Sequence, residues 1–168
     1  MKIKNKKIKN KKIKNKNKII KDKKIKNNNH KYLCYTNLLL SISFFYFVFN
    51  IHEETPFFEY VLASLLIATI ICSQLFWSNP IKKSKIHKLD AIIAKIVIFS
   101  FIFYTLLYKF MISFLFILLA IAISSYYSNY YSSQEWCSNH HLCWHGSLHI
   151  FCFIASFYAF FENNITPI

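Results

Sequence analysis

The sequence has very little glycine and no arginine, and both shortages narrow the possibilities. A single glycine among 168 residues, of which 55% are hydrophobic and 19% aromatic, is far from the mixed composition of a soluble domain. Lys, Asn, Ile, Phe and Tyr are frequent, a bias that an AT-rich coding sequence also produces. The composition therefore indicates a membrane protein, and the number of lysines is by itself weak support for a function.

Net charge is also nearly absent beyond residue 31. Residues 1–31 contain fifteen lysines and one aspartate, which account for the whole formal charge of +14. This tail begins with the pentapeptide KIKNK three times in succession, and a period of five does not place its isoleucines on one helical face. We expect 1–31 to be a disordered tail that sets the orientation of the chain in the bilayer or binds acidic lipid headgroups. No specific binding of nucleic acid is predicted.

Paired cysteine motifs are missing as well. The five cysteines are odd in number, include no Cys-x-x-Cys spacing, and mostly lie in or beside apolar runs. Cysteines in such positions behave as small hydrophobic residues, so no disulfide framework is implied. A structural zinc site formed by Cys137, Cys143 and His140 is a weak alternative for the same reason.

Five apolar runs approach the roughly 20 residues that a helix needs to cross a bilayer. They cover residues 33–51, 57–77, 90–108, 110–127 and 142–161. We therefore expect an all-α transmembrane bundle of about five spans over 32–168. Only Lys109 separates the third and fourth runs, so one long kinked span is the alternative to a tight hairpin there.

The lysines outside the tail predict the orientation of the spans. Four of them lie in the segment SNPIKKSKIHK after the second run, which the positive-inside rule places in the cytosol together with the tail. The segment 52–56 then lies on the opposite side, and so does the C-terminus. Continuing along the chain, the polar stretch 124–140 is expected to be cytosolic, with tyrosines and tryptophans that anchor it in the headgroup layer.

This orientation brings three helix ends to the same side of the membrane. Ser73 lies near the end of the second run, and His87 and Asp90 lie at the start of the third. A carboxylate at the centre of a span costs about 2.5 to 3.5 kcal/mol unless it is paired, hydrated or bound to metal. For Asp90 alone, a simpler interpretation is an interfacial carboxylate that favours the positive end of the helix dipole.

The fifth run begins with histidines at every fourth residue. These are His141, His145 and His149. On a helix they lie one above another along one face, and two imidazoles at this spacing can bind one Zn²⁺. A catalytic zinc site normally has a third protein ligand, which would come from another helix. The alternative is an interfacial cluster of solvated histidines.

Together these residues resemble the CREST superfamily of multi-pass membrane proteins, which contains alkaline ceramidases and the progestin and adipoQ receptors. The family pattern has a Ser at the end of one span, an Asp that opens the next, and His-x-x-x-His in the last span. Here the matching residues are Ser73, Asp90, and His141 with His145, and Trp144-His145 is similar to the Trp-His of ceramidase-like members.

The resemblance implies a zinc-dependent hydrolase of lipid amides. A zinc-bound water would attack the amide, Asp90 would accept the proton and Ser73 would stabilise the oxyanion. Two departures matter: Trp77 holds the position of the family's first histidine, and one span instead of three separates the Asp helix from the His helix. The third ligand would therefore be His87 or His149, or Asp90 itself.

The sequence is also compatible with two other classes of function. Histidine and aspartate inside a membrane also serve proton or cation transport, and stacked histidines can bind haem. The chain could also be a structural membrane component with interfacial histidines and a lipid-binding tail. The membrane that houses the protein and its oligomeric state are not indicated.

Overall fold

The computed structural model describes residues 28–109 and 112–161, in which helices are joined by short connections and no strand occurs. A short 3-10 turn, η1 (Asn28–His30), leads into five helices. They are α2 (Lys31–Phe49), α3 (Phe57–Ser78), α4 (Lys85–Tyr108), α5 (Ile112–Gln134) and α6 (Asn139–Phe160). Each of the five is long and apolar enough to cross a membrane. The prediction of an all-helical protein with five candidate spans is thus confirmed for the described residues.

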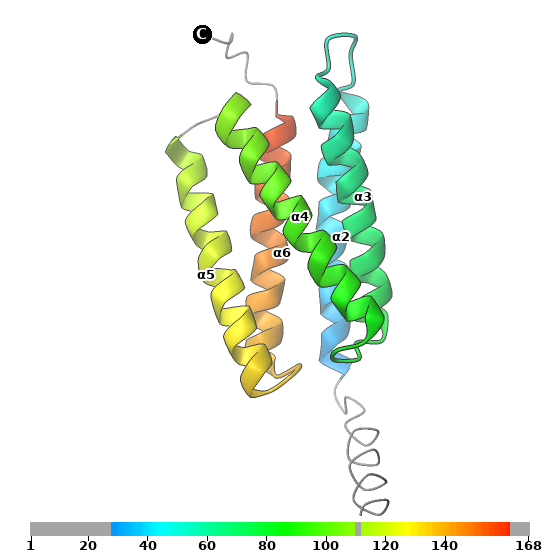
Figure 1. Ribbon diagram of the computed structural model, residues 1–168, viewed down its shortest axis with the longest axis vertical. Coiled ribbons are helices and arrows are strands. Elements are labelled where there is room, and N and C mark those ends of the chain that lie inside the picture. The colour runs from blue at the N-terminus through cyan, green and yellow to red at the C-terminus, as the bar shows by residue number, and fades with distance from the viewer. Residues whose placement is uncertain (1–27, 110–111, 162–168) are drawn as a thin grey trace, which may run out of the picture.

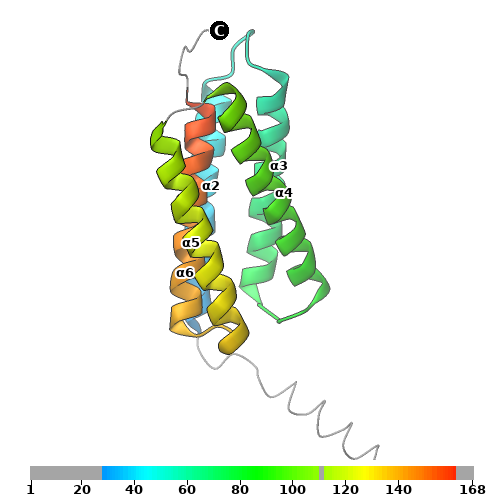
Figure 2. The same ribbon diagram turned by 60° about the vertical axis from the view of Figure 1, so that its left-hand side comes forward.

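The helices alternate in direction along the chain, so that every connection lies at one of two ends of the bundle (Figure 1). We call the end where α2 begins the Lys31 end and the opposite one the Phe49 end. α6 packs between α5 and α2, and α3 packs between α2 and α4. α4 crosses the bundle obliquely and also contacts α6, with α3 beside it in both views (Figure 2).

The predicted boundaries differ most at α5. The fourth apolar run was expected to end at residue 127, within a polar stretch 124–140, but the helix continues to Gln134. Ser124 and Ser128 are buried on one face of this extension, whereas Tyr126 and Tyr130 are exposed on the other. A serine can face the interior of a helical bundle when neighbouring helices offer hydrogen-bond partners, so its polarity does not end a helix.

Two further expectations concern segments that the structure describes only in part. The third and fourth apolar runs are separate helices, because α4 ends at Tyr108 and α5 starts at Ile112. α4 also starts at Lys85, earlier than the expected residue 90, with Ser84 as its N-cap. Most of the tail predicted over 1–31 lies outside the described residues; its last residues form η1 and begin α2.

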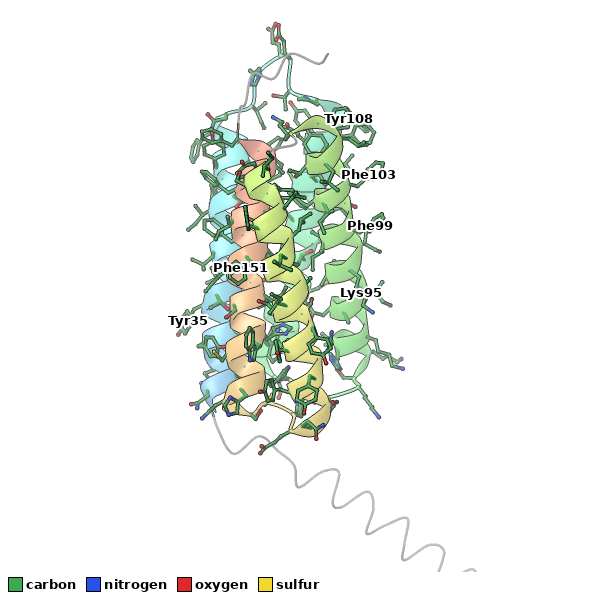
Figure 3. All side chains as sticks on the ribbon, turned by 90° about the vertical axis from the view of Figure 1, so that its left-hand side faces the viewer. Tyr35, Lys95, Phe99, Phe103, Tyr108 and Phe151 are labelled. Carbon is green, nitrogen blue, oxygen red and sulfur yellow. The ribbon has the colours of Figure 1, made fainter. Side chains whose placement is uncertain are left out.

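The outer surface and the interior of the bundle differ as expected for a membrane protein. Large side chains such as Tyr35, Phe99 and Phe103 project outward and are largely exposed (Figure 3). Inside, helices approach through small residues and polar bonds: the hydroxyl of Ser156 on α6 donates to that of Ser43 on α2 at 2.9 Å. This agrees with helix association in lipid, where close packing and interhelical hydrogen bonds replace the hydrophobic effect.

Candidate functional site

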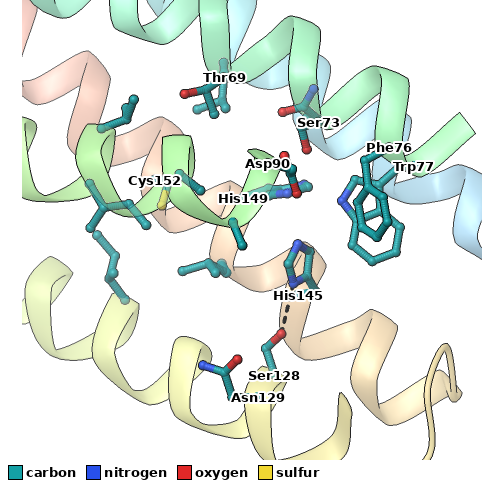
Figure 4. Close-up of a pocket in the computed structure, with 18 of the residues that line it drawn as sticks. Thr69, Ser73, Phe76, Trp77, Asp90, Ser128, Asn129, His145, His149 and Cys152 are labelled. Carbon is teal, nitrogen blue, oxygen red and sulfur yellow. Dashed lines mark hydrogen bonds between the residues drawn. The ribbon is translucent and has the colours of Figure 1, made fainter. Parts of the chain in front are cut away.

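A cavity of about 170 Å³ lies among the helices toward the Lys31 end, and we call it the central pocket (Figure 4). At about 30 Å³ of liquid volume per molecule, it has room for about five waters. Its wall is mainly apolar. The polar groups in the wall that we discuss below are Ser73, Asp90, Ser128, His145 and His149.

The helices bring three of these residues to nearly the same depth. Asp90 follows the start of α4 by five residues, Ser73 precedes the end of α3 by five, and His145 follows the start of α6 by six. At 1.5 Å per residue, all three lie about 8 to 9 Å inside the Lys31 end. Because the helices alternate in direction, the end of α3 and the starts of α4 and α6 lie at the same end of the bundle, as expected from the sequence.

Asp90 is buried, with 8% of its surface exposed. Figure 4 shows its carboxyl group facing the hydroxyl of Ser73, and these two side chains interact. The carboxyl group takes part in no ion pair: among the described residues, the ion pair that occurs joins Lys109 to Glu59 at the Phe49 end. A buried carboxylate without a cation is expensive to keep ionised, which favours a group that exchanges a proton or receives a ligand.

His145 turns its ring into the central pocket. Its Nδ1 lies 2.9 Å from the Oγ of Ser128 on α5, and its second nitrogen points toward Asp90 (Figure 4). The His149 ring, one turn further along α6, lies at 4.9 Å from the His145 ring, centroid to centroid. His149 is itself held at Nδ1 by the hydroxyl of Thr36 on α2, at 2.9 Å.

His87 and His141 have a different environment, because each belongs to a helix N-terminus. The sequences Ser84-Lys-Ile-His87 and Ser138-Asn-His-His141 share the spacing Ser-x-x-His. In both, the serine caps the helix and accepts the backbone N–H of the histidine, at 3.1 and 3.2 Å. This arrangement resembles the capping box, with histidine at the position usually held by Glu or Gln.

The two capping histidines also bind the residue before the serine. The Nδ1 of His87 accepts the N–H of Lys83 at 2.9 Å, and the Nδ1 of His141 accepts that of Cys137 at 3.2 Å. Lys83 and Cys137 both have positive φ, 65° and 59°, so each histidine stabilises a left-handed residue.

This bond decides which nitrogen of the capping rings carries a proton. An Nδ1 that accepts a hydrogen bond has no hydrogen, so a neutral ring is protonated at Nε2 and has no lone pair to offer there. His87 and His141 were predicted to bind metal together with His145 and His149. Their caps suit them to hold the helix starts and not to bind an ion in the central pocket.

Aromatic rings close the pocket at the Lys31 end. Trp77, 1% exposed, lies 4.8 Å from the His145 ring and stacks on Trp136 at 6.0 Å. Trp136 in turn contacts His87 and His141 at 5.1 and 4.9 Å. The Nζ of Lys82 lies over the Trp136 ring and donates to the carbonyl of Ser132 at 2.6 Å, which ties the loop before α4 to the end of α5.

A zinc ion needs three or four protein ligands, and the described part of the chain does not arrange them. No three side chains of His, Cys, Asp or Glu within residues 28–109 and 112–161 lie in positions to hold one ion. His145, His149 and Asp90 have the right chemistry for zinc, but they do not form a three-ligand set. The indole of Trp77 occupies the neighbourhood of His145, where the resemblance would place another histidine.

Cysteine does not supply the missing ligand near the caps. Cys137 lies between α5 and α6, and its burial raises the pKa of the thiol to about 12, although Lys82 opposes this rise. The thiol is therefore protonated at neutral pH while no metal is bound. All five cysteines are free.

Thr36 and Ser128 contact the site histidines but were not singled out in the sequence. Thr36 lies on the first span, away from every motif, and Ser128 lies just beyond the fourth apolar run. The spacing Ser-x-x-His, present twice in the chain, was the available signal for the caps, because it places a histidine at the third position of each helix.

Comparisons with known proteins do not identify a family for this chain. No protein-family model, no curated protein and no solved structure matches the chain. The resemblance to the CREST superfamily therefore depends on the spacing of Ser73, Asp90 and the histidines of α6.

Proposed function

We propose that the central pocket is the reaction site of a membrane hydrolase that cleaves an amide bond of a lipid. One observation carries the proposal: Ser73, Asp90, His145 and His149 converge from three helices on one cavity. Polar groups inside a membrane bundle are expensive unless they pair or perform a function. Asp90 has a hydroxyl beside it and no cationic partner within the described part of the chain, so ion pairing does not account for its burial.

The groups around the pocket can divide the steps of amide hydrolysis. A water oxygen attacks the carbonyl carbon, and the water proton passes to Asp90. Once Asp90 is protonated it donates to the Ser73 oxygen, and the Ser73 hydrogen is then donated to the oxygen that becomes negative. The carbon–nitrogen bond then breaks, and the leaving nitrogen takes the proton from Asp90, so that one water is consumed and an acid and an amine are released.

A more specific version of this proposal is that the hydrolase depends on zinc. A metal would polarise the carbonyl and activate the water, and His145, His149 and Asp90 are the residues that could donate to it. Because these groups are not arranged as a three-ligand set, we derive no step through a metal. Metal analysis of the purified protein tests this form: we expect about one zinc per chain, and a metal-free protein that is active would contradict it.

The apolar part of the wall supports a lipid substrate. The side of the pocket away from the Lys31 end is apolar. It is lined from three helices by Leu66, Val97, Phe101 and Ile121. Such a surface suits an acyl chain, while the polar groups nearer the Lys31 end suit an amide and a headgroup. The chain length and headgroup of the substrate are left to experiment.

The proposal is tested with purified protein in nanodiscs and a lipid amide whose acyl chain carries a fluorophore. We expect release of the labelled fatty acid, and a loss of about 100-fold in the Ser73→Ala variant because an oxyanion donor is removed. Ser64→Ala is the matched control: Ser64 lies on the same helix, is exposed, and only donates to the carbonyl of Tyr60. Equal rates in both variants, or no release by the unaltered protein, would overturn the proposal.

The orientation in the membrane is part of the proposal. The lysines Lys82, Lys83, Lys85 and Lys88 lie at the Lys31 end, and Glu53 and Glu54 lie at the Phe49 end. By the positive-inside rule we place the Lys31 end, and with it the central pocket, on the cytosolic side, with the tail on acidic headgroups. In sealed vesicles, a C-terminal tag should then be protected from protease and an N-terminal tag cleaved; the reverse pattern contradicts it.

A second candidate is proton transfer through the bundle. The rings of His141, His145 and His149 follow one another along α6, with centroids 5.8 and 4.9 Å apart. Such a series of histidines is typical of proton paths. In proteoliposomes with a pH-sensitive dye, acidification driven by a proton gradient and lost in His145→Ala would favour this function over hydrolysis.

A further inference from the structure

The bond between Thr36 and His149 joins two helices that are far apart in the sequence. Thr36 lies on α2, and its Oγ1 is 2.9 Å from the Nδ1 of His149 on α6. Both residues are largely enclosed, and α2 and α6 pack against each other along their lengths. The hydroxyl therefore meets the imidazole in a fixed geometry inside the bundle.

The direction of this bond follows from the second bond of Thr36. A hydroxyl has one hydrogen, and that of Thr36 is donated to the backbone carbonyl of Leu33 at 3.2 Å. In this arrangement the oxygen accepts toward His149, and the Nδ1 of His149 carries a hydrogen. The backbone of Leu33 is also a hydrogen-bond partner of His149, and a carbonyl in this place likewise requires a donor on the ring.

His141 provides the contrasting case on the same helix. Its Nδ1 accepts the N–H of Cys137, so its proton is on Nε2. For His149, two helical turns further along α6, the bond to Thr36 assigns the proton to Nδ1 and leaves Nε2 unprotonated when the Thr36 hydrogen is on the Leu33 carbonyl. The spacing of four residues makes the histidines look equivalent, but their partners give them opposite proton arrangements.

We infer that Thr36 is a positioning residue, which holds His149 as the Nδ1–H tautomer so that the Nε2 lone pair faces the central pocket. There the lone pair can accept a proton or bind a metal. In metal sites, carboxylates and carbonyls orient the ligating histidines in a similar way, by accepting the hydrogen of the other ring nitrogen. This deepens the proposed function by assigning His149, and not His141, as the second histidine of the reaction site.

The choice of variants follows from the surroundings of Thr36. Its side chain also lines a groove between α2 and α6, together with Tyr32, Leu142, Gly146 and Ile150. A smaller residue would let water enter from the groove and replace the hydroxyl. Thr36→Val fills the same volume without an acceptor, and Thr36→Ser keeps the hydroxyl.

The test is nitrogen NMR of protein labelled with ¹⁵N-histidine, in nanodiscs at a pH where the rings are neutral. The two ring nitrogens give distinct shifts in the two tautomers, and the signals of His149 and His141 are assigned with His149→Gln and His141→Gln. We expect the Nδ1–H form for His149 in the unaltered protein and in Thr36→Ser, and a shift toward the Nε2–H form in Thr36→Val. The His141 signals should stay in the Nε2–H form throughout and show that the fold is intact.

An Nε2–H form of His149 in the unaltered protein would overturn the inference, and so would an unchanged tautomer in Thr36→Val. The rate of lipid-amide cleavage is measured on the same samples. Thr36→Val should lower kcat by about 10-fold with little change in KM, as loss of a second partner of a site histidine does, and Thr36→Ser should restore it. If the tautomer changes as expected but no sample is active, the hydrolase proposal fails while the assignment of Thr36 stands.

Discussion

Two buried carboxyl groups at opposite ends of the bundle have different surroundings. Near the Phe49 end, Glu59 accepts the hydroxyl of Tyr104 at 2.6 Å and lies 3.4 Å from the Nζ of Lys109. Near the Lys31 end, Asp90 faces Ser73 in the wall of the central pocket, and no described residue forms an ion pair with it. A buried carboxylate with a hydrogen-bond donor and a cation beside it has a structural explanation. A buried carboxylate without a cation, beside a cavity, is a candidate reactive group.

The cluster around Glu59 joins three helices. Glu59 lies on α3 and Tyr104 on α4, and the ammonium group of Lys109 also donates to the carbonyl of Phe161, just after α6. Glu59 is 6% exposed. These contacts close the Phe49 end, so that α4, which crosses the bundle obliquely, is held at its C-terminal end by α3 and by the end of α6.

The largest effect that separates the two carboxylates is expected from Asp90→Asn. The amide has the shape of the carboxyl group but cannot accept the proton of water, so the rate of lipid-amide cleavage should fall by about 10² to 10⁴-fold. The folded fraction, measured by thermal unfolding in detergent, should change little. Glu59→Gln is the control for activity, and an equal loss of rate in both variants would show that the two ends do not differ in function.

A smaller effect on activity should distinguish the histidines of α6. His149→Gln should lower the rate by about 10 to 100-fold, because it removes a ring from the pocket wall. In His141→Gln the amide oxygen can still accept the N–H of Cys137, and we expect the rate to stay within about twofold. Equal losses would instead support the predicted pair of His141 and His145 and place His141 in the reaction site.

For stability the order is reversed: the substitution at Glu59 should have a larger effect than the one at Asp90. Glu59→Gln leaves Lys109 without its counter-charge and weakens the bond to Tyr104, which should lower the free energy of unfolding by about 1 to 3 kcal/mol. Thermal unfolding in detergent micelles reports this as a lower Tm. Glu54→Gln, an exposed residue in the loop before α3, is the matched control and should be neutral within about 0.5 kcal/mol.

The smallest effect is expected at the helix caps. Ser138→Ala removes the oxygen that accepts the N–H of His141, and loss of such a cap lowers stability by about 1 kcal/mol. Ser84→Ala should behave in the same way at α4. Ser147→Ala, on an accessible face of α6, serves as the control; if it lowers Tm as much as Ser138→Ala does, the capping role of Ser138 is refuted.

The sequence predicted the architecture better than the boundaries. Five apolar runs became five helices, and the charged Lys109 marked the end of α4. The fourth run was predicted to end at residue 127 because Ser128 and its neighbours are polar, while in the bundle α5 continues to Gln134 and the serine faces His145. Polarity alone does not distinguish a loop residue from an interhelical partner.

The candidate site was predictable only as a group of residues. Antiparallel spans place the end of α3 and the starts of α4 and α6 at one end of the bundle, so Ser73, Asp90 and His145 had to lie at similar depth. The roles of the histidines were not predictable in this way. A period of four residues defines a shared helical face, but it contains no information about which ring nitrogen has a partner.

The sequence by itself thus determined the number of helices, their alternating directions and the depth of the polar residues, because apolar length and chain connectivity control all three. Only the tertiary structure decided which histidines hold a helix start and which bond to a hydroxyl of a neighbouring helix. The reason is physical: the environment of each imidazole depends on its hydrogen-bond partner, and two of these partners, Thr36 on α2 and Ser128 on α5, come from other helices.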